Sequence, residues 1–171
     1  MRMLLLGAAA VAGFAIAAPA SAAPTDPQIA HIAYTAGQID VAAGKQALAR
    51  SHDKRVRAFA QEMVRDHQAV NDKALALVKK LGVTPEANPT SAALGKGAAA
   101  KLKELGALHG RAFDRAYVAN EVAYHRTVNG ALRDTLIPNA SNGELKALLE
   151  TGLTLFTEHQ KHAEHVAAEL R

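Results

Sequence analysis

The pattern of hydrophobic and polar positions predicts helices along nearly the whole chain. Apolar residues recur three or four positions apart over residues 26–50, 53–81, 110–137 and 144–171, the spacing that places them on one face of a helix. Residues 91–108 repeat this spacing more weakly and are interrupted by glycines. No stretch alternates as a strand would. We therefore predict an all-α fold, a four-helix bundle with one extra short helix in the connection between the second and third main helices.

Turn-forming residues separate these helices and support the same division. Ser51, His52 and Asp53 break the pattern with good N-cap residues, and Gly82 suits the end of the second helix. Residues 83–89 contain two prolines, and residues 138–143 form a cluster of turn residues. The stretch from residue 26 to residue 171 has the usual length of one domain.

The first 22 residues have the composition of a secretory signal peptide. Arg2 precedes an apolar core at residues 4–17, which is too short to span a bilayer. Ala20, Ser21 and Ala22 fit the small residues of a cleavage site, so we expect cleavage before Ala23. The prediction is export to the periplasm, with no transmembrane segment after cleavage. Association with the outer membrane stays open.

Composition and charge exclude several classes of function. The chain has no cysteine, so it has no thiolate ligand, no cysteine nucleophile and no disulfide. Only 4% of its residues are aromatic, and its alanine content favours closely packed helices. The formal net charge is +4, but the lysines and arginines are scattered and have no aromatic residues among them. We therefore expect no nucleic-acid partner. The sequence identifies no other partner and leaves homo-oligomer formation open.

Each main helix carries at least one ionisable residue on its apolar face, near the middle of the helix. These residues are Asp40, His67, Glu121 with His125, and His159. Burying such groups is costly unless they pair with one another or bind a cation. Their positions allow one shared layer across the bundle.

The last helix contains three histidines spaced three residues apart, and only the first is expected to face inward. Successive residues turn by about 100° around a helix, so His162 lies about 60° from His159, at the edge of the apolar stripe. His165 lies about 120° away and is expected to face water. On the second helix, Asp66 lies at the boundary of the stripe and Glu62 is expected to point outward.

A carboxylate combined with several imidazoles is a donor set that suits zinc, iron, manganese or copper. We therefore predict that the bundle binds a divalent transition metal, with zinc, iron and manganese as the candidates. The predicted ligands are His67, His125 and His159, with Glu121 or Asp40 as an anionic arm. The competing hypothesis is a buried histidine–carboxylate network without metal, in an envelope or stress-related interaction protein.

Several motifs resemble those of a known family. They are F-A-Q-E-M-V-R-D-H at residues 59–67, F-D-R-A-Y-V at 113–118, E-V-A-Y-H at 121–125, and E-H at 158–159. The chain resembles a secreted bacterial family of ferritin-like bundles that is catalogued as a domain of unknown function and often labelled an outer membrane protein. The resemblance implies a ferritin-like fold and export, but no established activity. It matches the three histidines, whereas Asp40 occupies a position that is usually Glu.

The sequence departs from ferritin itself at the candidate ligands. Di-iron bundles use Glu-x-x-His on two helices, but Glu121 lies four residues before His125, and Arg65 follows Glu62 by three. We therefore expect a single-metal site or a histidine-rich pair, without ferroxidase activity or iron storage. The chain contains no nucleophile elbow, P-loop or dinucleotide fingerprint. An enzymatic role has only the analogy of fold behind it.

Overall fold

The computed structural model describes residues 22–170, and this part of the chain consists of helices with no strand. The prediction of an all-α fold is confirmed. The predicted signal peptide lies outside the described residues, apart from Ala22 at its end. The elements are α1 (Asp26–Arg50), α2 (Lys54–Leu81), α3 (Pro89–Gly106), α4 (Gly110–Ala131), the π-helix η1 (Leu132–Leu136), α5 (Ile137–Asn139) and α6 (Gly143–Glu169).

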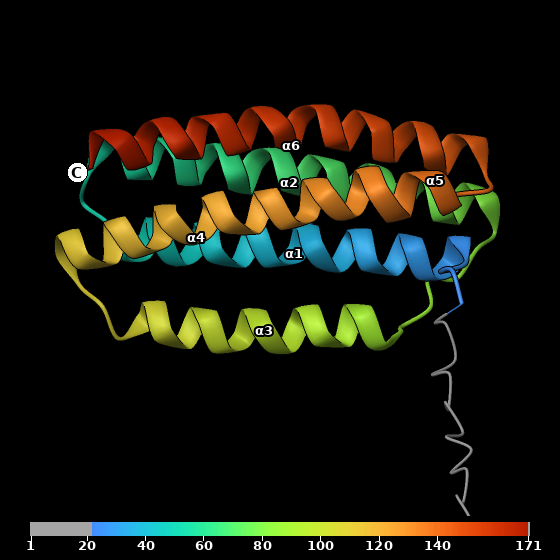
Figure 1. Ribbon diagram of the computed structural model, residues 1–171, viewed down its shortest axis with the longest axis horizontal. Coiled ribbons are helices and arrows are strands. Elements are labelled where there is room, and N and C mark those ends of the chain that lie inside the picture. Colours follow the sequence, from blue (N-terminus) through green and yellow to red (C-terminus); the bar gives the residue numbers. More distant parts are fainter. Residues whose placement is uncertain (1–21, 171) are drawn as a thin grey trace, which may run out of the picture.

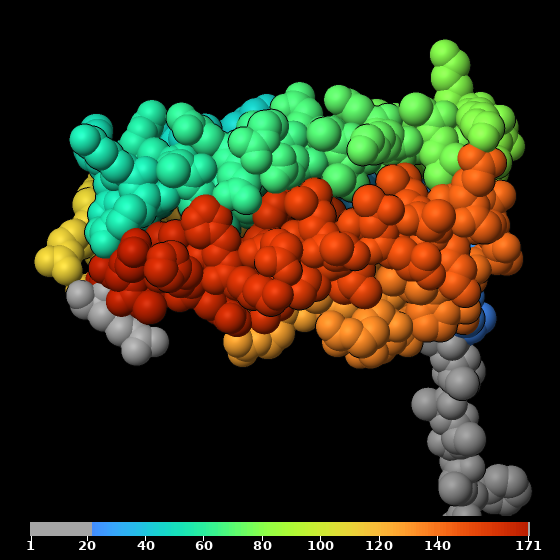
Figure 2. Space-filling view, turned by 90° about the horizontal axis from the view of Figure 1, so that it is seen from above, coloured from blue at the N-terminus to red at the C-terminus, as the bar shows by residue number. Residues whose placement is uncertain are grey.

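Four long helices, α1, α2, α4 and α6, lie side by side along the long axis of the molecule, and α3 lies along one side of them (Figure 1). Seen from above α6, helices α2 and α6 are neighbours over most of their length (Figure 2). Residues 51–53 connect α1 directly to α2, while α3 lies in the long connection between α2 and α4. The molecule is thus two helical hairpins joined by a long crossover.

Two of the predicted helices differ from expectation. Residues 110–137 were predicted as one regular helix, but the α-helical geometry ends at Ala131 and a π-helix follows over Leu132–Leu136. The helix predicted at residues 91–108 as a short, weak element is an uninterrupted 18-residue α-helix, Pro89–Gly106. It begins two residues early because Asn88 caps its first turn by accepting a hydrogen bond from the Ser91 N–H.

Side chains at the helix ends explain why the long helices begin and end where they do. Asp53 accepts a hydrogen bond from the Arg55 N–H at 2.9 Å and so caps α2. Gly82 adopts the left-handed conformation, with φ of 64°, that ends the same helix. Asn142 caps α6 by accepting from the N–H groups of Glu144 and Leu145.

Polar contacts from α1 hold α3 in place. The Arg50 guanidinium donates to the carbonyl oxygens of Gly106 and Leu108, at 2.6 and 2.8 Å, at the C-terminal end of α3. Gln46 donates to the Leu102 carbonyl at 2.8 Å. Leu105 is buried between these contacts. Helix α3 therefore covers α1 with an apolar face.

The apolar core is divided into two halves. The closed half is the cluster that contains Val56, Phe59, Met63, Phe113 and Tyr117. The hollow half is the cluster that contains Ile29, Ile32, Leu132, Leu136, Leu145, Leu149 and Phe156, and it borders a cavity of about 820 Å³. The polar layer described next lies between the two. Within residues 22–170, no helix is both long enough and apolar enough to cross a membrane.

Candidate metal centre

The five ionisable residues predicted to face inward lie together in the middle of the molecule. Helix α1 contributes Asp40, α2 contributes His67, α4 contributes Glu121 and His125, and α6 contributes His159. All five are at most 2% exposed. Each belongs to the apolar face of its helix, so it faces the core, and the four helices are aligned so that these residues lie at one depth.

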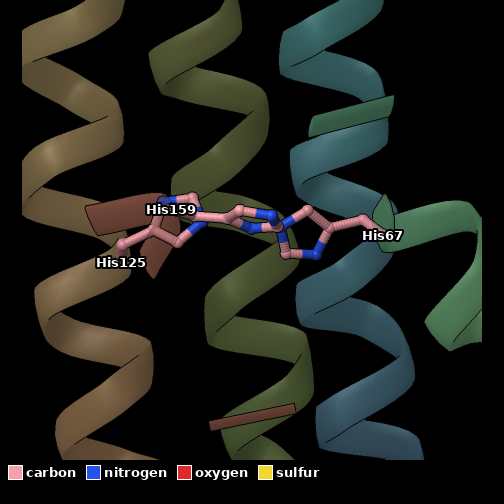
Figure 3. Close-up of side chains that lie close together, drawn as sticks. All are labelled: His67, His125 and His159. Atoms are coloured by element: carbon pink, nitrogen blue, oxygen red, sulfur yellow. The ribbon is translucent and has the colours of Figure 1, made fainter. Parts of the chain in front are cut away.

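The three histidines form the centre of this layer. His67, His125 and His159 point toward one another from three different helices (Figure 3). Their ring centroids are 5.5 Å apart for His67 and His125, 5.2 Å for His67 and His159, and 5.6 Å for His125 and His159. Each histidine offers one ring nitrogen within 4.8 Å of those of the other two.

Each imidazole has one ring nitrogen close to an oxygen outside the cluster. His125 Nδ1 lies 3.0 Å from the Glu121 carbonyl oxygen, and His159 Nε2 lies 3.1 Å from Asp66 Oδ2. His67 Nε2 faces Asp40 Oδ2 at 3.5 Å. Such contacts favour a proton on that nitrogen and leave a lone pair on the other.

The remaining ring nitrogens are buried and have no hydrogen-bond partner. They are His67 Nδ1, His125 Nε2 and His159 Nδ1, and His67 Nε2, although 3.5 Å from Asp40, makes no hydrogen bond either. A buried nitrogen without a partner is costly, and three of them occur in one place. The arrangement is the one expected when outer contacts orient metal-binding imidazoles.

Burial keeps all three imidazoles neutral. It lowers the pKa of His67 well below the ordinary value, and the other two imidazoles lower it further. Burial likewise lowers the pKa of His125 to about 4. It also lowers the pKa of His159, although Asp66 acts in the opposite direction. Neutral imidazole is the form that binds a metal, so the site is ready to do so at neutral pH.

Two buried carboxyl groups adjoin the histidines. Asp40, Glu121 and His125 offer ligand atoms within 4.8 Å of one another. Burial raises the pKa of Glu121 to about 7 and, together with the charge of Glu121, raises the pKa of Asp40 well above its usual value. The pair therefore tends to hold a proton near neutrality, and each member can supply one negative charge to a cation.

A second polar group lies on the side of the layer nearer to solvent. The sequence-based expectation that Glu62 points outward is wrong, because its Oε2 lies 2.7 Å from His162 Nδ1 on α6 and the side chain is only 29% exposed. Glu62 and Asp66 also offer oxygens within 4.8 Å of a His159 ring nitrogen. Arg65 Nε donates to Asp66 at 2.7 Å.

The pattern on one helix could not reveal this second group. Glu62 and His162 lie at the edges of two apolar stripes, and they meet only because α2 and α6 pack with those edges together. His162 lies at the edge as predicted. His165 is exposed, 3.3 Å from Glu169, in agreement with the prediction that it faces water.

The donor set fits a divalent transition metal. Metal–nitrogen distances of about 2.1 Å place tetrahedral ligand nitrogens roughly 3.4 Å apart. One ring nitrogen of each histidine lies within 4.8 Å of those of the other two, so small side-chain rotations suffice to bring them to the separation that a metal requires. Three neutral nitrogens leave a coordination position free for water or for a carboxylate oxygen.

The fold and this layer define an all-helical protein with a buried, histidine-rich centre. The chain belongs to the family described as a domain of unknown function (DUF4142), which it matches over residues 12–166. The predicted resemblance to a helical family of unknown function is thereby supported. No curated protein matches the chain.

A solved structure has a similar fold. It is the crystal structure of a protein from Streptomyces coelicolor that is described as secreted and as DUF305. The TM-score is 0.69 with 14% sequence identity, over 84% of this chain and 91% of that one. At this identity the likeness shows the fold alone.

Proposed function

We propose that this protein is an exported helical bundle that binds one divalent transition metal between its helices. His67, His125 and His159 are the ligands, and zinc, iron and manganese are the candidate ions. The metal serves either in metal handling or in stabilising the fold. We include in the proposal that residues 26–171 form a ferritin-like four-helix bundle, with α3 as the extra helix in the connection.

The observation that carries the proposal is a group of three buried histidines, each with a ring nitrogen that has no hydrogen-bond partner and each offering one ring nitrogen within 4.8 Å of those of the other two. A histidine–carboxylate network without metal would use these nitrogens in hydrogen bonds within the network. Instead, the hydrogen bonds with the Glu121 carbonyl and Asp66 engage only the opposite ring nitrogens of His125 and His159, and His67 makes no hydrogen bond at either nitrogen. That distribution favours a cation at the centre over a closed network.

The carboxyl groups adjust the charge of the site. Asp40 faces His67 from α1, and Glu121 lies one turn before His125 on α4. Either carboxylate can approach a cation bound by the histidines and supply the anionic arm. Because the pKa of Glu121 is about 7, its proton is readily released when a cation approaches.

The proposed location is the periplasm, after removal of residues 1–22 as a signal peptide. Two points support export: the composition of those residues and the similarity in fold to a protein described as secreted.

The test is the metal content of the mature protein, purified from the periplasm without a histidine tag. We expect one metal ion per chain in the wild type and almost none in His67→Ala or His159→Ala. Added Zn²⁺, Mn²⁺ or Fe²⁺ should raise the Tm of the metal-free wild type and leave that of both variants unchanged.

His165→Ala is the matched control, because His165 belongs to the same triplet on α6 but is exposed. It should retain the metal. Wild-type protein that takes up no metal, and whose Tm does not respond to any of the three ions, would contradict the proposal. That result would favour the buried network of an envelope or stress-related interaction protein.

A further inference from the structure

The hollow half of the molecule contains a cavity that the proposed metal centre does not use. Its volume is about 820 Å³, within the roughly 300–1,000 Å³ that is usual for small-molecule sites. Helices α1, α2, α4 and α6, the π-helix η1 and the start of α3 all contribute to its walls. Phe156 lines the cavity and stacks on His67 with ring centroids 4.5 Å apart, so the cavity reaches the polar layer.

Small residues and the π-helix make this half hollow. Ala30, Ala33, Ala36, Gly37 and Gly152 line the cavity where larger side chains would fill it. The lining residues Leu132, Thr135 and Leu136 belong to the π-helix. Turns of π-helix within α-helices are rare and occur frequently at functional sites.

No side chain in the wall carries a charge. Among the lining residues there is no aspartate, glutamate, lysine, arginine or histidine. A carboxylate or an ammonium group in this cavity would lose its hydration and find no charged side chain to pair with, at a cost of several kcal/mol. Ala23 also lines the cavity, and cleavage before it makes its α-amino group the one charge among the lining residues of the mature chain. Where that amino group is neutral, the wall favours a neutral occupant.

One polar side chain in the wall is buried and incompletely paired. Asn71 is 2% exposed, lies one turn beyond His67 on α2 and lines the cavity, and its Nδ2 has no hydrogen-bond partner. Its amide packs against Gly37 on α1, where a Cβ atom would collide with the Asn71 amide oxygen. The glycine therefore allows the amide to occupy this position. A buried amide N–H₂ without a partner is a donor available to a ligand oxygen.

We propose that the cavity binds a neutral, elongated, apolar molecule with a carbonyl oxygen that accepts a hydrogen bond from Asn71 Nδ2. The apolar part occupies the space between Ile32, Leu136 and Leu149, while the carbonyl end lies toward Phe156 and the histidine layer. Esters of fatty acids and quinones both have this chemistry. The proposal does not depend on metal binding.

The test uses mature protein without added metal and the neutral fluorescent probe N-phenyl-1-naphthylamine. Wild-type protein should bind the probe at micromolar concentration. Methyl esters of C8–C14 fatty acids, or a short-chain benzoquinone, should displace it, and the stronger competitor identifies which source fits. The free fatty acid of equal length, as its carboxylate at about pH 9.5, where the α-amino group of Ala23 is neutral, should compete at least tenfold more weakly.

Probe binding to two variants shows whether the cavity is the binding site. Ala36→Leu fills the cavity from α1 and should weaken probe binding at least tenfold. Ala69→Leu, on the exposed face of α2, is the control and should bind as the wild type does. If Ala36→Leu does not fold, as judged by circular dichroism, Ala74→Leu fills the same cavity from α2.

Asn71→Leu tests the carbonyl contact. It should reduce competition by the ester or quinone about tenfold, equivalent to one hydrogen bond of about 1.4 kcal/mol, and leave the affinity for the apolar probe unchanged. An equal loss for the probe and the carbonyl competitors would overturn the role of Asn71. Absence of probe binding to the wild type, or unchanged binding to the filled variant, would overturn the site itself.

Discussion

The closed and hollow halves of this molecule are built from the same four helices but are packed differently. In the closed half, Phe59, Met63, Phe113 and Tyr117 are all fully buried and fill the space between the helices. In the hollow half, several alanines and glycines line a cavity of about 820 Å³. The histidine layer lies at the boundary. The difference teaches that the same four helices can form a filled core at one end and a cavity at the other, with the polar layer between them.

The largest expected effect comes from truncating one core residue in each half. Met63→Ala should lower the free energy of unfolding by about 4 kcal/mol, because it opens a void in a filled core. Leu149→Ala should cost only about 2 kcal/mol, because Leu149 already borders a cavity. Urea denaturation measures both values. Equal losses would show that the two halves are packed alike.

The second effect is the pH dependence of stability that the polar layer produces in the metal-free protein. Burial lowers the pKa values of His67 and His125, so the unfolded chain takes up protons below about pH 6.5 that the folded chain excludes, and their contribution to stability rises with pH. The contribution of Glu121, whose pKa is about 7, changes with pH in the opposite direction. The folded chain keeps its proton between pH 4.5 and 7 while the unfolded chain releases it, so its contribution falls with pH.

Replacing Glu121 by Gln should therefore remove the contribution of Glu121, which falls with pH, and keep those of the histidines and of Asp40, whose pKa burial also raises. We expect the Glu121→Gln protein to be more stable than the wild type at pH 8, by on the order of 2 kcal/mol, and equally stable near pH 4.5. Chemical denaturation across pH 4.5–8 with a chelator present tests this. An unchanged difference at all pH values would mean that Glu121 does not titrate in this range.

A third pair of changes adds one methyl group to each half. Gly44→Ala in the closed half would place its Cβ 2.8 Å from Val64 Cγ2 and 3.1 Å from the Ala60 carbonyl oxygen, and should cost about 1–3 kcal/mol. Gly152→Ala in the hollow half meets only the Phe156 ring at 3.4 Å. It should stabilise the protein by about 0.5 kcal/mol, because alanine favours the helix. Thermal unfolding of both variants gives the comparison, and two changes of the same sign would contradict it.

At the helix ends the two halves should not differ. Asp53 caps α2 at the closed end, and Asn142 caps α6 at the hollow end. Replacing either by alanine should cost about 1 kcal/mol, because capping is a local interaction. Denaturation midpoints of the two variants provide the measurement. A loss confined to one end would show that capping is coupled to the packing of that half.

The sequence predicts the inward residues of the layer well, because the spacing on a single helix decides which residues face the core. His67, His125, His159, Asp40 and Glu121 were all found in this way. Glu62 was missed because its environment depends on how α2 and α6 face each other. Asn71 was missed because an amide among apolar residues is not conspicuous, and its role depends on Gly37 on another helix. The π-helix has no sequence signature that apolar spacing can reveal.

The π-helix also bears on how this architecture can change over time. Its hydrogen bond from the Ile137 N–H to the Leu132 carbonyl spans five residues where an α-helix spans four. The segment is thus equivalent to an α-helix with one residue inserted. Deleting one residue there would restore regular α-helical hydrogen bonding and change the part of the cavity wall that Leu132, Thr135 and Leu136 form. Loss or gain of a single codon at this turn would therefore reshape the hollow half, while His125 lies upstream on α4 and His67 and His159 lie on other helices.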